Sequence, residues 1–345
     1  SGVLHLWGGL RMSWFRESIG PVNSAWLSGR ELNDGAVPAT PLPQRRLSNY
    51  VPRMDPNDAS RGHYRGLPPD EIAEVDGIKM FAQIARDSFE EHDGQLLGED
   101  FLGVLKADVD RLGAIFGQGL KDPSLGMLAG LSRRIDYFFT GYLPDLLRRN
   151  PEFRSTYTVY AGGDDLLLIG PWRQMTSLLL TLHEDLHAWT GQNPQVTISA
   201  ALELVHENEP LNRSAHAAEE ALNRAKDAGR NRVSILSPDP LTWSEYREQL
   251  AASAEVAQLI RDGTVGLAFL YRMLGLDDDR MHVVRAGRDP SGSREPLKME
   301  RAAWRARWSY QVQRNIRDNR ALSPDQKERL ESVLNRLMGV GPNAT

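Results

Sequence analysis

Two adjacent carboxylates, Asp164 and Asp165, follow two glycines in the stretch YTVYAGGDDLLLIG, residues 157–170. The apolar runs on either side predict two short strands, and the Gly-Gly-Asp step between them predicts a β-hairpin. Gly162 and Gly163 allow positive φ and leave room for a phosphate to approach the backbone. Because two adjacent like charges repel each other and cannot enter a core unpaired, we expect a cation at this hairpin tip.

A second pair of acidic residues lies upstream, in the stretch KADVDRLG. The apolar run 101–109 predicts a buried strand, and Asp108 and Asp110 stand at its end, on one side of the pleat. In an antiparallel sheet this strand end would lie beside the hairpin tip. The carboxylates could then hold two divalent ions, one activating a 3′-hydroxyl and one binding a triphosphate for attack at the α-phosphorus. A plain hairpin turn also explains Gly and Asp, but the second acidic pair favours a metal site.

The elements that must position these residues form an α/β pattern. We expect helices over 69–92, 125–149, 172–189 and 212–229, and further strands over 195–204 and 232–237. Residues beyond 242 are almost wholly helical in pattern. The chain therefore divides into a connecting region (1–70), a sheet domain with the Gly-Gly-Asp-Asp motif (71–238) and an all-α domain (239–345).

Composition narrows the class of protein. The 345 residues carry a net charge of −5, so a nucleic-acid or membrane surface could only be a local patch. The absence of cysteine excludes disulfides, cysteine-rich zinc sites and thiol catalysis. With no apolar run of membrane-spanning length and no recognisable signal peptide, we expect a soluble, cytoplasmic protein without a membrane partner.

Three other acidic or histidine-containing stretches carry weaker signals. His183-Glu184-x-x-His187 matches the zinc-protease pattern, but it falls on a helix predicted to cover the sheet and no third ligand is evident. His92-Asp93 lacks the further ligands that a nuclease needs. Asp277 to Asp279 are expected in an acidic loop or at a helix start.

A local basic patch occurs in the last third of the chain, in REPLKMERAAWRARWSYQVQRNIRDNR. At helical spacing Arg301, Arg305 and Trp308 share a face, which suits phosphate contacts supported by an aromatic ring and makes them candidate RNA-binding residues. The alternatives are a surface helix with buried tryptophans and a docking face for a small helical protein.

Several segments, in order and at family-like spacing, resemble the second palm domain of the large polymerase/cyclase subunit of type III CRISPR effector complexes. They are FLGVLKADVDRLGAIFGQGL, LSRRIDYFFTGYL, YTVYAGGDDLLLIGPW, VTISAAL and AAEEALNRAKDAGRNRV. The phrase RRLSNYVPR favours the III-A branch. The resemblance covers roughly residues 45–240 and implies a ferredoxin-like palm followed by a helical domain, the C-terminal half of that subunit. Residues 1–70 would be a connecting region or the tail of a first palm domain. Neither a first palm domain nor a His-Asp nuclease domain is recognisable.

The resemblance also implies a reaction, namely synthesis of cyclic oligoadenylates from ATP with Mg²⁺ or Mn²⁺, triggered by target RNA in antiviral defence. Asp164 and Asp165 would be catalytic, and the metal ligands would be Asp108, Asp164, Asp165 and Asp110. The nucleotide would contact Gly162, Gly163, Gly113, Phe116, Lys226 and Arg230. Implied partners are a guide-RNA complex with its small helical subunit and its stem- or repeat-binding subunit.

Two alternatives stay open. A scaffold could bind ATP or RNA without synthesis. Diguanylate-type cyclases share the palm and a similar turn, but the segment with which they read guanine is absent here.

Overall fold

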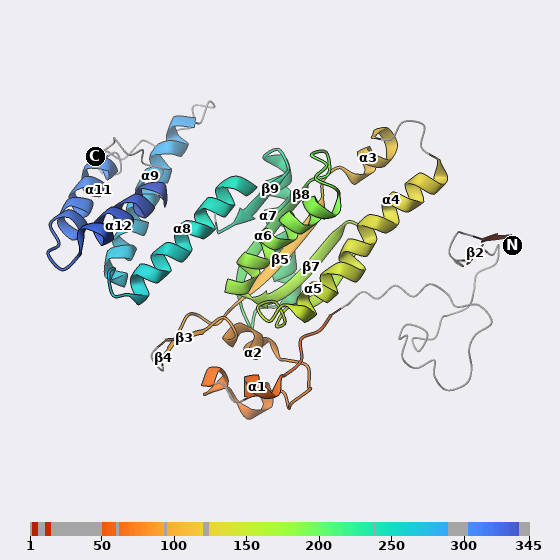
Figure 1. Cartoon of the computed structure of the whole chain (residues 1–345), viewed down its shortest axis with the longest axis horizontal. Helices are drawn as coiled ribbons and strands as arrows, with labels where there is room; N and C mark the ends of the chain where they lie inside the picture. Colours follow the sequence, from red (N-terminus) through yellow and green to blue (C-terminus); the bar gives the residue numbers. More distant parts are fainter. Residues whose placement is uncertain are drawn as a thin grey trace.

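The structure is a computed structural model that describes residues 2–5, 11–14, 50–59, 62–92, 95–119, 124–236, 239–288 and 303–337. Its centre is a six-stranded sheet with the order β10-β9-β8-β5-β7-β6 (Figure 1). The strands are β5 (Phe101–Val109), β6 (Tyr157–Gly162), β7 (Asp165–Pro171), β8 (Ile198–His206), β9 (Arg232–Ile235) and β10 (Leu241–Thr242). Two small hairpins pair β1 (Gly2–His5) with β2 (Arg11–Trp14), and β3 (Glu90–His92) with β4 (Gln95–Leu97).

The four strands β8-β5-β7-β6 have the order and antiparallel pairing of a ferredoxin-like sheet. One face is covered by α4 (Leu125–Tyr137), the π-helical turn η6 (Phe138–Tyr142), α5 (Leu143–Arg149) and α6 (Trp172–Trp189). The other face is covered by α2 (Phe81–Arg86) and α7 (Leu211–Asp227). The predicted palm is confirmed in this arrangement.

Alternation along β5 explains why both faces are covered. Leu105, Ala107 and Val109 enter the core against α4 to α6, whereas Leu102 and Val104 pack toward α2 and α7. A strand that is buried on both sides reads as a continuous apolar run, as observed in the sequence. The polar exceptions, Lys106 and Asp108, contact α7 through ion pairs with Glu219 and Lys226.

The all-α part begins with α8 (Trp243–Arg261), which leads from the sheet to α9 (Leu267–Arg288), α11 (Trp304–Val312), the π-helical turn η7 (Gln313–Arg317) and α12 (Pro324–Leu337) (Figure 1). Its core is separate and is built around Trp304, Trp308 and Ile316. None of the described helices is both long and apolar enough to cross a membrane. The sheet continues through β10 to Thr242, slightly past the boundary expected at residue 238.

The helix expected over 69–92 is mostly wrong. Only Phe81–Arg86 is α-helical, while Pro69–Glu71 forms a 3₁₀ turn (η5) and Glu90–His92 forms strand β3. A tight turn with Asp76 at φ 64° breaks the pattern, and Gly77 N–H donates to Glu74 O in that turn. The short elements α1 (Pro56–Ala59) and η4 (Gly62–Tyr64) precede it.

A buried ionic network attaches this irregular segment to the palm. The Lys79 ammonium group contacts Asp58 Oδ2 at 2.8 Å, Asp87 Oδ2 at 2.7 Å and Ser155 Oγ at 3.0 Å. The Lys79 side chain is 1% exposed. Arg154, which lies just before β6, donates to the other Asp58 oxygen at 2.6 Å. The positive charges of Lys79 and Arg154 therefore offset the negative charges of Asp58 and Asp87 where the segment contacts the palm.

Removing one member of this network should be costly. We predict that Lys79→Met lowers the free energy of unfolding by about 3–5 kcal/mol, because two carboxylates stay buried without the shared ammonium group. Chemical denaturation measures the change. The matched control is Arg149→Met, which removes the exposed Arg149–Asp145 pair and should cost no more than about 1 kcal/mol. Equal effects from both variants would contradict the prediction.

Candidate active site

The hairpin between β6 and β7 presents the Gly-Gly-Asp-Asp motif beside the end of β5. Gly162 pairs with Asp165, so Gly163 and Asp164 form a two-residue turn. Gly163 has φ 75° while Asp164 is not among the residues with positive φ, the pattern of a type II′ turn, which takes glycine first. Asp108 pairs with Asp165 across the sheet, and Val109 N–H donates to Asp164 O at 2.9 Å. The predicted meeting of strand end and hairpin tip is confirmed.

Asp108 is held by a cation from α7. Its Oδ2 lies 2.5 Å from Lys226 Nζ, and both side chains are about three-quarters buried. Burial raises the pKa of Asp108, Lys226 opposes that rise, and the nearby carboxylates of Asp164 and Asp110 add to it. Lys226 is thus a cation bound to Asp108 beside the hairpin, whereas a cation at Asp164 and Asp165 themselves stays a prediction.

Asp165 has a different partner. Tyr160 OH donates to Asp165 Oδ2 at 3.2 Å, and the Lys106 ammonium group lies 5.8 Å from the centre of the Tyr160 ring. Lys106 in turn forms an ion pair with Glu219 of α7. Burial is the main cause that raises the pKa of Tyr160, so its hydroxyl remains a donor at neutral pH.

Asp110 is buried and its carboxylate is engaged on both oxygens. Ser199 Oγ donates to Oδ1 at 2.7 Å, while Thr197 Oγ1 and Asn231 N–H donate to Oδ2 at 2.8 and 3.0 Å. Asn231 lies in the turn after α7, where it and Arg230 have positive φ. In this structure Asp110 fastens that turn to β8, a role that differs from the metal ligand expected from the sequence.

The four predicted ligands therefore do not form one cluster. In the part of the chain that the structure describes, no group of three or more His, Asp or Glu side chains is arranged to hold a metal ion. Asp164 and Asp110 both lie near enough to Asp108 to raise its pKa, but the Asp110 and Asp165 carboxylates accept hydrogen bonds from other side chains. Two hard carboxylates fit Mg²⁺ or Mn²⁺ when substrate phosphates complete the shell.

The predicted nucleotide contacts occupy two places. Gly113 and Phe116 lie in α3 (Leu112–Gln118), directly after β5, and nothing lies within 4 Å of a Cβ built at exposed Gly113. Arg230 follows α7, the helix that carries Lys226, and is half-buried. The structure places both segments at the Asp110 end of β5.

Among the described residues, the remaining acidic and histidine-containing stretches do not bring three His, Asp or Glu side chains together around a metal position. His183 stacks on Trp243 with ring centres 4.2 Å apart, Glu184 binds Arg247 at 2.8 Å, and His187 is exposed. His92 lies in β3, and Asp93 lies outside the described residues. Asp277 to Asp279 belong to α9 rather than to a loop.

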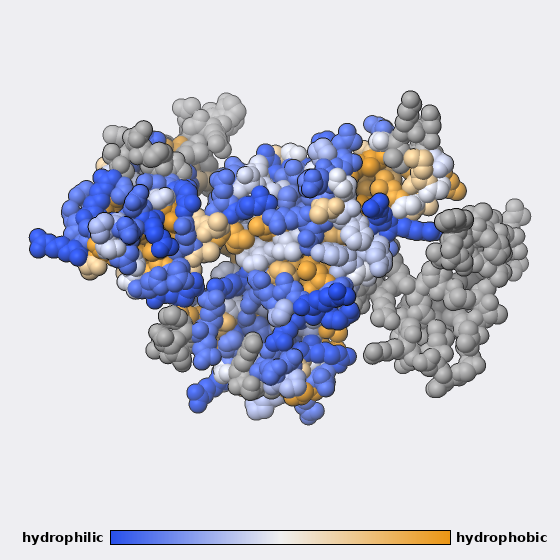
Figure 2. Space-filling model, viewed as in Figure 1, coloured by the Kyte–Doolittle hydropathy of each residue, from blue (hydrophilic) through white to orange (hydrophobic). Residues whose placement is uncertain are grey.

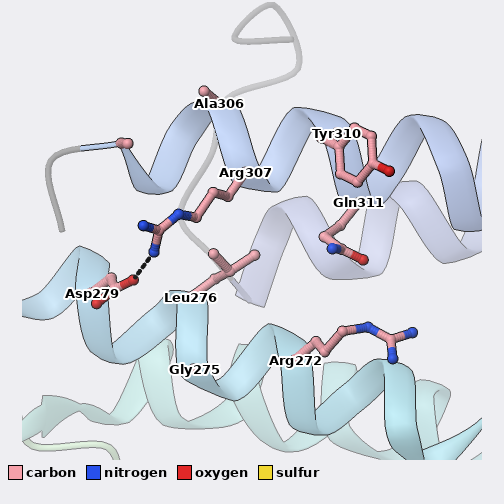
Figure 3. A pocket seen from close by; sticks show the side chains of 9 residues that line it. Arg272, Gly275, Leu276, Asp279, Ala306, Arg307, Tyr310 and Gln311 are labelled. Carbon is pink, nitrogen blue, oxygen red and sulfur yellow. Dashed lines mark hydrogen bonds and ion pairs between the residues drawn. The ribbon is translucent and has the colours of Figure 1, made fainter. Parts of the chain in front are cut away.

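RNA binding at Arg301, Arg305 and Trp308 stays a prediction, but Trp308 does not share an exposed face with Arg305. Trp308 is 1% exposed and belongs to the helical core, whereas Arg305 is exposed and lies over the Trp304 ring at 5.4 Å. Arg301 is outside the described residues. A cavity of about 600 Å³ lies nearby between α9 and α11, and Figure 3 shows the Arg307–Asp279 pair and Tyr310 at its wall.

Sequence reasoning missed two residues that contact the motif, Tyr160 and Asp136. Tyr160 reads as an ordinary strand residue, and only the pairing of β6 with β7 brings its hydroxyl to Asp165. Asp136 lies on α4 and accepts a hydrogen bond from Gly163 N–H at 2.7 Å. Neither contact follows from a local pattern.

The fold and the paired acids define a palm domain of the nucleotidyl cyclase and polymerase type. Residues 101–234 match the family model described as Cas10/Cmr2, second palm domain. This segment is therefore similar to a Cas10-type second palm domain.

Curated relatives agree with the family model. The chain is 36% identical over 184 residues to a Cas10/Csm1 protein of Thermococcus onnurineus, described as a subtype III-A CRISPR single-strand-specific deoxyribonuclease. That match covers 47% of this chain and 23% of the relative. A Mycobacterium tuberculosis Cas10/Csm1 is 24% identical over 310 residues, covering 77% of this chain and 37% of the relative. The chain thus spans well under half of these relatives.

Solved structures are similar to this chain over more of its length than the sequence matches are. The crystal structure of Csm1 from T. onnurineus matches with a TM-score of 0.58 at 23% identity, covering 90% of this chain and 42% of that one. An apo Csm1–Csm4 cassette gives 0.58 at 24% identity, with the same coverage. At this identity the match shows the shared fold.

The hydrogen bonds of Asp110 allow a structural role to be distinguished from a role as a metal ligand. We predict that Asp110→Ala lowers the free energy of unfolding by about 2–4 kcal/mol, because two hydroxyl groups and one buried N–H lose their acceptor. We expect Asp110→Asn to lose roughly half as much and to leave Mn²⁺ affinity, measured by calorimetry, within about 3-fold of the unmodified chain. A Mn²⁺ affinity that falls 10-fold or more in a folded Asn variant would instead make Asp110 a ligand.

His183 gives a pH dependence with a defined sign. Burial lowers its pKa to about 4, below the ordinary value of about 6.5, so the unfolded chain takes up the proton first as pH falls. Stability is complete above about pH 6.5 and decreases toward pH 4, by roughly 1–2 kcal/mol after solvent screening. His183→Phe keeps the stacking on Trp243 and should flatten the unfolding free energy in this window. An unchanged slope in the variant would refute the assignment.

Proposed function

We propose that the chain is part of the large subunit of a type III-A CRISPR effector, a cytoplasmic ribonucleoprotein. Its palm would bind ATP with Mg²⁺ or Mn²⁺ and contribute to target-RNA-activated synthesis of cyclic oligoadenylates. The observation that carries this proposal is the meeting of Asp108 and Asp164 beside Lys226 on a ferredoxin-like palm. Hard anions and a phosphate-binding cation at adjacent strand ends suit a nucleoside triphosphate.

The described residues divide the work. Asp108 and Asp164 would hold the metal ion, which when bound neutralises the triphosphate and makes the 3′-hydroxyl a better nucleophile. Lys226, which pairs with Asp108 in this structure, would release that carboxylate and bind a phosphate oxygen. Tyr160 orients Asp165 through its hydroxyl. Asp165 would therefore stabilise the turn and its charge and contribute less than Asp164 to metal binding.

Solved relatives support the same assignment. Related Csm1–Csm4 cassettes have been determined in complex with one ATP, with AMPPNP and with cA4. By analogy, the partners proposed here are a Csm4-like subunit that binds the RNA stem or repeat, a small helical subunit, guide RNA and target RNA. The alternative is a scaffold that binds ATP or RNA without synthesis, favoured by the lack of a three-acid metal group among the described residues.

Single substitutions at the two aspartates should separate their roles. In the guide-RNA complex with α-labelled ATP, we predict that Asp164→Ala lowers RNA-dependent oligoadenylate formation at least ~100-fold. We expect Asp165→Asn to lose about 10-fold at most, because Tyr160 can still donate to the amide oxygen. Asp145→Asn, an exposed acid on α5, is the matched control and should retain full activity.

Each other outcome has a meaning. If the complex binds target RNA and makes no product from ATP, the scaffold alternative replaces the proposal. If product forms from GTP in preference to ATP, the diguanylate-type reading gains the support that the sequence lacks. Equal losses at Asp164 and Asp165 would refute the division of roles.

A further inference from the structure

The backbone N–H of Gly163 takes no part in the hydrogen bonds that pair β6 with β7. In a two-residue hairpin, the residues that flank the turn pair with each other, here Gly162 with Asp165. The amide of Gly163, first in the turn, has no cross-strand carbonyl to meet. A buried or half-buried N–H without an acceptor costs free energy, so an outside group must supply one.

Asp136 supplies that acceptor from a different layer of the fold. Its Oδ1 accepts from Gly163 N–H at 2.7 Å, from the last turn of α4 and 27 residues away in sequence. The short distance and the charged acceptor place this contact among the stronger hydrogen bonds. The turn that carries Asp164 is thereby tied to a helix as well as to its own strands.

The helix that carries Asp136 is itself firmly anchored. Phe138 and Phe139, in the π-helical turn directly after α4, are fully buried. Tyr142 OH donates to Asp185 of α6 at 2.7 Å, and Trp189 Nε1–H of α6 donates to Arg134 O at 3.0 Å. Two apolar residues of α4, Tyr137 and Leu125, are nevertheless 61% and 76% exposed, and Figure 2 shows apolar surface at this end of the molecule.

We propose that Asp136 is a positioning residue, which holds the Gly163 amide and thereby sets the distance between the Asp164 and Asp108 carboxylates. The consequence for catalysis rests on the proposed function, whereas the contact itself does not. Because Asp164 follows Gly163 directly, a turn released from α4 would pivot about β6 and β7 and displace its carboxylate. Displacements of about 1 Å at reacting groups can cost about 100-fold in rate.

The first measurement is independent of any activity. Amide hydrogen exchange at Gly163, followed by NMR or by mass spectrometry of the peptide that contains it, is compared between the full chain and its variants. We expect Asp136→Ala to raise the exchange rate at least ~10-fold and Asp136→Asn, which keeps a neutral acceptor, to raise it about 3-fold. Asp145→Asn removes a charge from the next helix and leaves the rate unchanged.

The second measurement uses the assembled guide-RNA complex with target RNA and labelled ATP. Asp136→Ala should lower kcat about 10- to 100-fold with KM for ATP within about 3-fold, and raise the Mn²⁺ concentration for half-maximal rate. Asp136→Asn should recover most of kcat, which a loss of fold stability alone would not produce.

The outcomes are separable. An unchanged Gly163 exchange rate in a folded Asp136→Ala variant overturns the positioning role. If the alanine variant does not fold, the Asn variant decides by the same criterion. Accelerated exchange with an unmodified complex that makes no oligoadenylate would refute the proposed function and leave the contact intact.

Discussion

The register of β5 against both of its neighbours is the constraint on which the site depends. Asp108 lies opposite Asp165 of β7 and Ser199 of β8, so one position on the central strand aligns three elements. Side chains along a strand alternate between its two faces. A shift of the register by one residue would therefore place Asp108 and Lys106 in the core against α4 to α6. The apolar faces of β5 resist such a slip, since Leu105, Ala107 and Val109 would then leave that core. Packing of the interior therefore sets the geometry of the acids.

Four acids near the hairpin, Asp108, Asp165, Asp110 and Asp136, each have a compensating group. Lys226 neutralises Asp108, the Tyr160 hydroxyl binds Asp165, three donors surround Asp110, and the Gly163 amide binds Asp136. Repulsion among clustered carboxylates is thus reduced by separate partners from α7, β6, β8 and the turn. These partners come from different parts of the chain, so formation of the site requires the whole palm to be folded.

Short sequence patterns predicted the elements whose structure depends mainly on neighbouring residues. Short stretches of sequence were enough to predict these elements: the apolar run predicted β5, the glycines predicted the hairpin, and the amphipathic pattern predicted α6 and α7. The failures lie where tertiary contacts prevail. The segment 69–92 is mostly not helical and is held to the palm through the buried Lys79 network. Trp308 packs in a core that residues of α8, α9, η7 and α12 complete. Asp110 accepts hydrogen bonds from Ser199 of β8, Thr197 and the turn after α7. Asp136 and Tyr160 could not be linked to the motif before the strand pairing was known.

The distribution of similarity follows from the same constraint. The closer sequence match to T. onnurineus Cas10/Csm1, 36% identity, extends over 184 residues, whereas the fold likeness to Csm1 covers 90% of the chain at 23% identity. In the palm, register, turn glycines and paired acids must all be compatible at once, so few substitutions leave the geometry intact. In the helical part, Trp304, Trp308 and Ile316 pack in a core that tolerates exchange of apolar side chains as long as volume and pattern persist.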